Sequence, residues 1–334
     1  MGRYRSQPEL RMLVSAGDLR KSPKMTADPF SEILNLSQAQ AVHAGGFTAG
    51  GPWAIRFHAR HRIKMSAVLK GSCWVWLEGE AEPVRLEAGD VGLLTAQRSY
   101  VMASAPGLEP VEATSLFSGP GPTMAVLGDG ADFSFVGGHV LLHPTNGWLL
   151  ADVLPPWLHI KANSPEAATF SWLLNQLVEE GSADLPGAQL AASHLAQLLF
   201  TQILRAHVRA GGPLPVGWLR ALADPRAAPA LRLMHAEPGR AWSLEALAKA
   251  CAMSRTSFAA HFKAVSGKAP LAYLTDWRMR LAERALQDDT VAVAAIGHAL
   301  GYSSESAFSH AFKRVTGRSP RAYRRDAKPG QVLV

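Results

Sequence analysis

The first half of the chain alternates apolar and polar residues over short runs. Between about Val42 and Val140, apolar side chains fall on alternate positions in WAIRFH, from Trp53, and in SCWVWL, from Ser72. The turn-forming segments EGEAEP, EAGD, APGLEP and SGPGP separate such runs. A period of two residues is typical of half-buried strands, and many short strands at this spacing predict an antiparallel barrel or sandwich.

After Pro144 the apolar positions follow a helical period. Residues 165–180 and 188–209 are predicted to form two amphipathic helices. The apolar stripe of the second helix contains Leu195, Leu198, Leu199 and Ile203. The segment GGPLPVG, residues 211–217, then breaks the pattern, and Asp224 followed by Pro225 favours a new helix start. We therefore place a domain boundary at Asp224.

The C-terminal part contains a repeat. The segment SRTSFAAHFKAVSGKAPLAYL, from Ser254, returns fifty residues later as SESAFSHAFKRVTGRSPRAYR, from Ser304. Each copy has two phenylalanines and a valine at positions i, i+4 and i+7, so these side chains share one helix face. A short helix precedes each copy, SLEALAKACAM before the first and VAVAAIGHAL before the second. A short helix, a tight turn and a second helix with a polar outer face form the helix-turn-helix pattern.

The two predicted second helices differ in their outer faces. In the first copy, over Arg255–Ser266, the outer residues are Thr256, Ala259, Ala260 and Lys263. In the second copy, over Ser304–Thr316, they are Ser306, Ser309, His310 and Lys313. The repeated phenylalanines of both copies are expected in the core, which leaves these outer residues available for a partner.

The segment between the copies, APLAYLTDWRMRLAERALQDD, has no glycine or proline beyond its first turn. It predicts a single helix of about 19 residues, about 28 Å long. One turn of B-DNA is about 34 Å. A rigid connector of this size suits two DNA-contacting helices, one from each copy, placed in adjacent segments of the major groove on one face of a duplex.

The charge of the chain is unevenly distributed. Residues 225–334 carry 17 Lys/Arg and 8 Asp/Glu, a balance of +9, whereas residues 1–224 carry 17 and 19, a balance of −2. A basic C-terminal domain indicates a polyanionic partner, with a solvated basic face as the alternative. Cys73 and Cys251 fit no metal-ligand spacing and suit a reducing cytoplasm. The sequence contains no run of about 18 apolar residues, so it predicts no membrane span.

The double unit, from about Leu231 to Arg325, resembles the DNA-binding domain of the AraC/XylS family of bacterial transcription regulators. Its most specific stretch is IGHALGYSSESAFSHAFKRVTGRSPRAYRR. The resemblance implies that the outer residues of both recognition helices meet DNA, with basic residues beside them on phosphates. The implied DNA-binding residues are Arg255, Thr256, Ala259, Ala260, Lys263, Ser304, Ser306, Ser309, His310, Lys313, Arg318 and Arg321.

These residues divide into two expected roles. The phosphate contacts, which position the protein without specifying sequence, are Lys263, Lys313, Arg318 and Arg321. Ala259 and Ala260 stand where family members often carry larger polar side chains. Alanine touches a thymine methyl group but forms no hydrogen bond to a base, so the first helix is expected to read less sequence than the second. Arg255 either compensates or binds phosphate.

The segment LKGSCWVWLEGEAEPVRLEAGDVGLLTAQRSYVM is similar to the cupin-type sensor domain of many AraC-family regulators, and the similarity extends loosely from Asp28 to about Pro156. It implies a barrel that binds a small effector, followed by a helix that dimerises the protein. The candidate effector-pocket residues are Trp53, Phe57, Trp74 and Trp76, which otherwise fill the barrel core. The candidate dimer residues are Leu195, Leu198 and Leu199, which otherwise pack against the barrel or the neighbouring helix.

The predicted fold is α+β, with six parts. Residues 1–24 are a disordered arm or a start-site extension without the apolar region of a signal peptide. Residues 25–160 are a cupin-like β-barrel sensor, 161–210 a helical dimerisation region and 211–224 a linker. Residues 225–327 are an all-α DNA-binding domain with two helix-turn-helix motifs joined by a long helix, and 328–334 a tail.

The predicted function is a cytoplasmic, sequence-specific transcription regulator and not an enzyme. Its expected partners are double-stranded DNA, a small-molecule effector, a second copy of the chain and, for an activator, RNA polymerase. No cofactor or metal is expected, because His58 and His61, the close histidine pair, would face opposite sides of one strand. The alternatives are a cupin metal enzyme with a DNA-binding appendage, a DNA-repair methyl acceptor with zinc-bound cysteines, and an architectural DNA binder without an effector.

Overall fold

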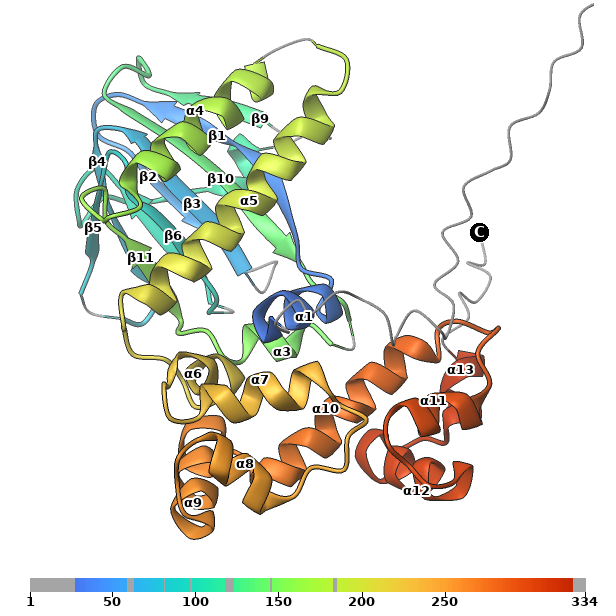
Figure 1. The fold of residues 1–334 in the computed structure, drawn as a ribbon. Coiled ribbons are helices and arrows are strands. Elements are labelled where there is room, and N and C mark those ends of the chain that lie inside the picture. The colour runs from blue at the N-terminus through green and yellow to red at the C-terminus, as the bar shows by residue number, and fades with distance from the viewer. Residues whose placement is uncertain are drawn as a thin grey trace, which may run out of the picture. The chain divides into compact units, whose positions relative to one another are not determined.

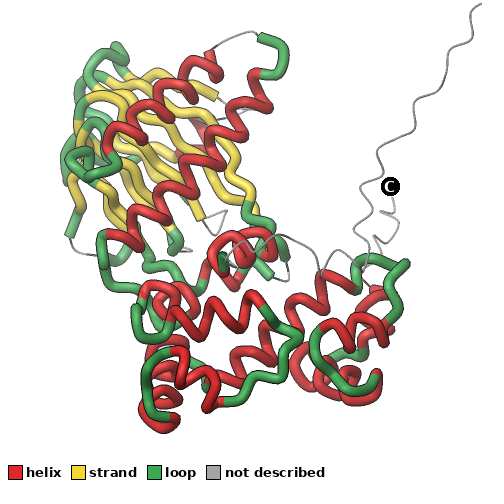
Figure 2. The backbone as a smooth tube through the Cα atoms, viewed as in Figure 1, coloured by secondary structure: helices red, strands yellow, loops and turns green. Residues whose placement is uncertain are grey.

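The computed structural model describes residues 28–58, 63–80, 82–96, 98–117, 123–144, 146–182 and 185–326. The predicted arm, the predicted tail and His61 lie outside these residues. The described chain forms two compact units, one of residues 30–228 and 256–269, the other of residues 229–255 and 270–326. The described strands all belong to the first unit, and every described element after Ile160 is a helix (Figures 1 and 2).

Two sheets make up the β-rich part of the first unit. The strands are β1 (Gln40–Ala49), β2 (Ala54–Phe57), β3 (Ile63–Lys70), β4 (Ser72–Leu77), β5 (Val84–Glu87), β6 (Val91–Leu94), β7 (Tyr100–Ala103), β8 (Val111–Glu112), β9 (Thr123–Leu127), β10 (Phe133–Leu141) and β11 (Trp157–Ile160). One sheet has the order β11-β6-β3-β10-β1-β9 and the other β5-β4-β7-β2-β8. Most neighbours are antiparallel, as predicted, but β1 pairs with β9, and β2 with β8, in parallel.

The apolar positions of the alternating runs form a core to which both sheets contribute. In β4, Cys73, Val75 and Leu77 are buried, whereas the two tryptophans on the other face are only half-buried. Phe47 of the six-stranded sheet meets Trp53, which precedes β2, with ring centroids 5.1 Å apart. Each aromatic side chain of this kind buries about 150–250 Å², so these rings supply a large share of the apolar area that holds the sheets together.

Strand β1 approaches β10 closely and is bent. A Cβ atom on Gly46 would lie 2.0 Å from the carbonyl oxygen of Phe135, so this position requires glycine. The register between the strands shifts between His43 and Gly45. A bulge of this kind locally increases twist and bends the strand. The bent segment forms part of the wall of a cavity described below.

Helices cover one side of the six-stranded sheet. α4 (Ala167–Ser182) and α5 (Ala188–Arg209) confirm the two predicted amphipathic helices and lie side by side (Figure 1). α5 packs on β1, where the amide oxygen of Gln197 accepts a hydrogen bond from the backbone N–H of Ala41 at 2.8 Å. The first unit also contains α1 (Pro29–Leu36), α2 (Ala113–Leu116), α3 (Trp148–Ala151), α6 (Trp218–Ala223) and α9 (Arg255–Ser266).

The predicted linker, residues 211–224, contains the helix α6 and is therefore not an unstructured connection. Trp218 is buried, and its indole N–H donates to the carbonyl oxygen of Leu149 at 2.5 Å. Its ring also lies 6.3 Å from that of Phe30. The glycines and prolines before α6 predicted the break correctly. The segment WLRALA is too short for a helical period to be recognised.

The second unit is built from helices. They are α7 (Ala228–Ala236), α8 (Leu244–Ala250), α10 (Pro270–Ala285), α11 (Val293–Ala299), α12 (Glu305–Thr316) and α13 (Pro320–Asp326). α10 confirms the prediction of one long helix between the repeats. The predicted start at Asp224 is a capped turn before α7, since its carboxylate accepts hydrogen bonds from the backbone N–H groups of Arg226 and Ala227, both at 2.9 Å. Along the described ranges, no helix combines the length and apolar character needed to cross a bilayer.

Candidate DNA-binding helices and a cavity between the sheets

The second helix-turn-helix has a compact apolar core. Met279 of α10, Ile296 of α11, and Phe308 and Phe312 of α12 are buried together. The two phenylalanine rings lie 5.8 Å apart, and Phe312 meets the ring of Tyr323 edge-on at 5.6 Å. The repeated phenylalanines of this copy are therefore core residues, as predicted, and they fix which face of α12 points outward.

Both ends of α12 have the caps that a helix requires. The Ser304 hydroxyl accepts a hydrogen bond from the backbone N–H of Ala307 at 3.1 Å. Such an N-cap satisfies one of the free N–H groups at a helix start. Gly317 follows the helix with a φ of 77°, the left-handed conformation common after helix C-termini. Ser304 is thus a helix cap as well as a predicted DNA contact.

The outer face of α12 is wider than the sequence predicted. Ser306, His310 and Lys313 are exposed, as required for a DNA contact, but Ser309 is half-buried. Arg314 is also exposed. It stands four residues after His310 and therefore on the same face. The sequence analysis missed Arg314, although its spacing from His310 could have identified it.

The first recognition helix, α9, has the same arrangement. Phe258 and Phe262 are fully buried, with ring centroids 5.7 Å apart. The predicted DNA contacts that are exposed here are Arg255, Thr256, Ala260 and Lys263. Ala259 is half-buried, like its counterpart in α12, so this position of the repeat lies at the edge of the outer face.

Residues 217–224 anchor α9 within the first unit. The backbone N–H of Gly217 donates to the carbonyl oxygen of Val265 at 3.0 Å. Nε2 of His261 lies 3.0 and 3.1 Å from the two carboxylate oxygens of Asp224. Burial alone would raise the pKa of Asp224, but hydrogen bonds from His261 and from two backbone N–H groups outweigh it and lower that pKa. The contact between His261 and Asp224 spans 37 residues of sequence, so no local pattern predicts it.

The two arginines predicted to bind phosphate beside α12 are exposed and carry acidic partners. Arg318 lies 3.3 Å from Asp326, and Arg321 lies 3.2 Å from Glu305. Exposed ion pairs contribute only about 0–1 kcal/mol to stability. Exchanging these ion pairs for contacts with DNA phosphates therefore costs little free energy of folding.

A cavity of about 300 Å³ lies between the two sheets. Four aromatic rings line it: Phe57, Tyr100, Phe117 and Phe135. The backbone of the bent part of β1 forms another part of the wall. Its polar wall includes His58, Lys64, Thr114 and His139. The volume lies at the lower end of the range for small-molecule sites, about 300–1,000 Å³.

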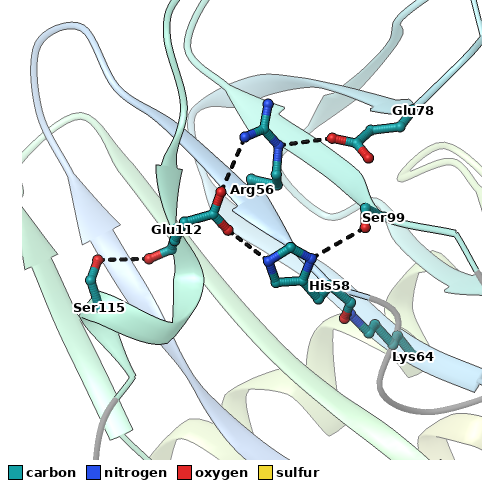
Figure 3. A network of polar contacts seen from close by, with 7 residues as sticks. All are labelled: Arg56, His58, Lys64, Glu78, Ser99, Glu112 and Ser115. Atoms are coloured by element: carbon teal, nitrogen blue, oxygen red, sulfur yellow. Dashed lines mark hydrogen bonds and ion pairs between the residues drawn. The ribbon is translucent and has the colours of Figure 1, made fainter.

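A network of charged side chains holds the wall of this cavity (Figure 3). Arg56 donates to Oε1 of Glu112 at 3.1 Å and forms an ion pair with Glu78 at 2.8 Å. Nε2 of His58 lies 2.8 Å from Oε2 of Glu112, and its Nδ1 lies 3.4 Å from the Ser99 hydroxyl. Glu112 directly precedes α2, whose residues line the cavity, so the network fixes the position of this wall.

The four aromatic residues predicted for an effector pocket occupy three different environments. Phe57 lines the cavity. Trp53 is buried in the core, and Trp74 and Trp76 lie on the face of β4 away from the buried residues, so these three do not line it. Alternation predicted two faces correctly for β4, but size and apolarity suggested the wrong face as the inner one.

The three leucines predicted for a dimer seam also differ from one another in their exposure. Leu199 is buried, with 4% of its surface exposed, and Leu195 is half-buried, because α5 packs on the sheet and on α4. Leu198 is 41% exposed. Leu190, two turns earlier on the same face, is 63% exposed. An outward apolar stripe therefore exists on α5, but it contains Leu190 and Leu198.

The groups capable of metal or thiol chemistry in the described β-rich part of the first unit are dispersed or buried. Burial raises the pKa of the Cys73 thiol to about 12, with a further contribution from Asp90. A thiol with this pKa is almost entirely protonated at neutral pH, and the protonated form is a poor nucleophile. Within the residues that the structure describes, no group of three or more His, Cys, Asp or Glu residues is arranged to hold a metal ion.

Comparison with known proteins assigns the two parts of the sequence to two known families. Residues 28–209 match a family model described as Cupin, and residues 247–326 match one described as Helix-turn-helix domain. A putative AraC-like transcription regulator of Streptomyces lividans is 39% identical over 84% of this chain and 93% of its own length. One of Streptomyces antibioticus is 37% identical over the same shares. The crystal structure of ToxT from Vibrio cholerae covers 88% of this chain and 99% of its own at 12% identity, with a TM-score of 0.34.

Two independent matches therefore agree with the helices and sheets described above. The cupin match spans more than half of the chain, and the relatives named as AraC-like regulators match most of it. The chain belongs to the family of AraC-like transcription regulators, with a cupin-type N-terminal domain and a DNA-binding C-terminal domain of the helix-turn-helix type.

Proposed function

We propose that this protein binds specific sites on double-stranded DNA through α9 and α12 and changes its activity when a small molecule binds the cupin-type domain. The observation that carries the proposal is the matching design of the two helices. In each, two buried phenylalanines orient an exposed face that ends in a lysine, Lys263 or Lys313. The +9 balance of residues 225–334 supports a polyanionic partner for this face.

The exposed residues have two roles in this proposal. Thr256 and Ala260 of α9, and Ser306 and His310 of α12, face base edges. The basic residues beside them, Arg255, Lys263, Lys313, Arg318 and Arg321, contact phosphates and set the position of the protein on the duplex. Arg314 joins the second group because it shares the exposed face of α12.

A homodimer is a further part of the proposal. Leu190 and Leu198 of α5 form an exposed apolar stripe, and Trp172 of α4 is 56% exposed. A second copy of the chain would remove this apolar surface from water. We also propose that the dimer is cytoplasmic. We propose that it activates transcription by contacting RNA polymerase.

The proposed function does not include catalysis. The relatives that match most of the chain are named as transcription regulators, which favours a sensing role for the cupin-type domain over a metal enzyme. The cavity then serves to bind a ligand without converting it.

The test is binding of the purified full-length protein to fragmented host DNA at about 0.15 M ionic strength, with and without a small-molecule extract of host cells. Sequencing of the bound fragments should show a few enriched sites with two half-motifs about one helical turn, 34 Å, apart. Diffuse, salt-sensitive binding under both conditions would contradict the proposal and indicate an architectural DNA binder.

A further inference from the structure

A half-buried arginine in the second unit contacts segments that are far apart in the sequence. Arg278 lies in α10, the helix between the two copies of the repeat. Its Nε donates to the carbonyl oxygen of Pro238 at 2.6 Å, and its Nη2 donates to that of Arg240 at 2.8 Å. Its guanidinium group also lies 5.8 Å from the ring centre of Tyr302, between α11 and α12. The helix α10, the loop before α8 and the turn of the second helix-turn-helix therefore meet at one side chain.

The loop of residues 237–242, which runs from α7 to α8, is held by contacts of its own. The indole N–H of Trp242 donates to the carbonyl oxygen of Glu237 at 3.0 Å. The guanidinium group of Arg240 lies 4.1 Å from the ring centre of Trp242. The backbone N–H of Arg240 donates to Glu237 at 3.1 Å, and that of Trp242 donates to Arg240 at 2.9 Å. The carbonyl groups that Arg278 contacts are therefore fixed within a compact loop.

The same loop lies directly against the turn of the second helix-turn-helix. A Cβ atom on Gly239 would lie 2.3 Å from the carbonyl oxygen of Ala299, and one on Gly301 would lie 2.2 Å from that of Gly239. A side chain at either glycine would force the two backbone segments apart. This close approach and the contacts of Arg278 together hold the loop, and α8 directly after it, against the second helix-turn-helix.

The guanidinium group is suited to this position by its shape. It carries N–H donors in a rigid fork, so one side chain reaches two carbonyl oxygens from fixed directions while it also meets an aromatic ring. A lysine ammonium group is a point charge on a flexible stem and would hold the loop less firmly. Arg278 therefore fixes the orientation of the loop as well as its contact with α10.

We propose that Arg278 is a positioning residue for DNA recognition, which sets the distance between the two half-motifs that the protein accepts. This inference rests on the proposed function, in which both helix-turn-helix motifs bind one duplex. A single helix between two motifs can bend at its terminal residues, where hinges commonly form. The loop of residues 237–242 supplies a second connection. The chain passes from α8 to α9 through residues 251–254, so a fixed α8 restricts the whole first motif.

The test is a spacing series on the site enriched from host DNA, with one, two or three base pairs inserted between the half-motifs. Each inserted pair moves one half-motif by about 3.4 Å and turns it by about 35° around the duplex. The full-length wild-type protein should lose affinity about tenfold or more at each insertion, because contacts to several bases are lost together. Arg278→Met should bind the original site more weakly but lose only about threefold or less at each insertion.

The ratio of affinities between spacings is the decisive quantity, because a general loss of stability lowers both affinities alike. Arg284→Met is the matched control, since it removes the same charge from an exposed position of α10 and should keep the wild-type ratio. Arg278→Lys keeps the charge without the fork and should lower the ratio to a smaller extent. It replaces Arg278→Met if circular dichroism shows that variant to be unfolded. A wild-type ratio in the folded Arg278 variant, or an equal fall in Arg284→Met, would overturn the proposal.

Hydrogen exchange without DNA separates this inference from the proposed function. In the Arg278 variant, the backbone N–H groups of residues 237–242 and 299–302 should exchange about tenfold or more faster than in the wild type. In Arg284→Met they should not. Unchanged exchange in the Arg278 variant would overturn the proposal even if the wild type binds specific sites. A wild type without specific sites would contradict the proposed function and the spacing role together, and the exchange rates would still show whether Arg278 connects the two segments.

Discussion

At the scale of single residues, the two recognition helices offer different chemistry at equivalent positions of the repeat. His310 of α12 stands where α9 has Ala260, and Arg314 stands where α9 has Ala264. Histidine and arginine donate hydrogen bonds to base edges or phosphates, whereas alanine offers a methyl group. We therefore expect α12 to supply most of the hydrogen-bonded readout and α9 mainly shape and phosphate contacts.

Lys313→Ala and His310→Ala test this division. Loss of a phosphate contact should weaken binding to all sequences and reduce the slope of log affinity against log salt by about 1. Loss of His310 should instead change the preferred base at one position by about 1–3 kcal/mol and leave the slope unchanged. Binding titrations on a site and its single-base variants at several salt concentrations measure both effects. Identical behaviour of the two variants would contradict the assignment.

The residues that the sequence predicted well and those that it missed differ in a physical way. Helical periodicity predicted the buried Phe308 and Phe312 and the exposed Lys313, because a period of 3.6 residues specifies which residues share a face. A period of two residues specifies two faces of a strand but not which is inside, so Trp74 and Trp76 were assigned to the wrong side. Lys64 was missed because a lysine in a strand is typical of a solvated surface, and only the fold brings it to a cavity.

At the scale of elements, the turn of the second helix-turn-helix depends on close contact between two backbone segments. Gly301 has a φ of 83°, and a Cβ atom there would lie 2.2 Å from the carbonyl oxygen of Gly239. Gly317, after α12, has a similar φ of 77° but no atom within 4 Å of such a Cβ. The two glycines therefore separate the cost of backbone conformation from the cost of a collision.

We expect Gly317→Ala to destabilise the protein by about 1–2 kcal/mol, the cost of a left-handed conformation for an L-residue. Gly301→Ala adds a collision with backbone, and overpacking typically costs about a further 1–3 kcal/mol. Differential scanning calorimetry should therefore show a larger fall in Tm for Gly301→Ala, together with weaker DNA binding. Equal effects of the two substitutions would show that the contact with Gly239 is unimportant.

At the scale of the whole molecule, the apolar surface of α4 and α5 is the feature that a single copy leaves unexplained. Leu190, Leu198 and Trp172 are exposed on helices whose other faces pack in the first unit. Exposed apolar side chains that occur singly are normal, but these three lie on two helices that pack side by side. The repeat along one helix face favours a second copy of α5 as the partner.

Leu198→Glu tests the dimer by placing a charge on this stripe. Burying an unpaired carboxylate is strongly unfavourable, so the dissociation constant of the dimer should rise by about tenfold or more. Gln189→Glu adds the same charge on the same helix, one residue from Leu190 and off the stripe, and should leave the dimer intact. Sedimentation velocity at several concentrations distinguishes the two. A wild-type protein that sediments as a monomer throughout would contradict the dimer itself.

The anchoring of α6 has a consequence for anyone who recombines this regulator with another. A hybrid joined at residue 225 would carry the cupin-type domain of one parent and α9 of the other, and would separate His261 from Asp224. A junction between residues 211 and 216 would keep α6, Asp224 and α9 from one parent. The new cupin-type domain would then have to accommodate Trp218, which here donates a hydrogen bond to Leu149 and packs on Phe30. Compatible parents are those that match at these sites, even where the rest of their cupin-type domains differ.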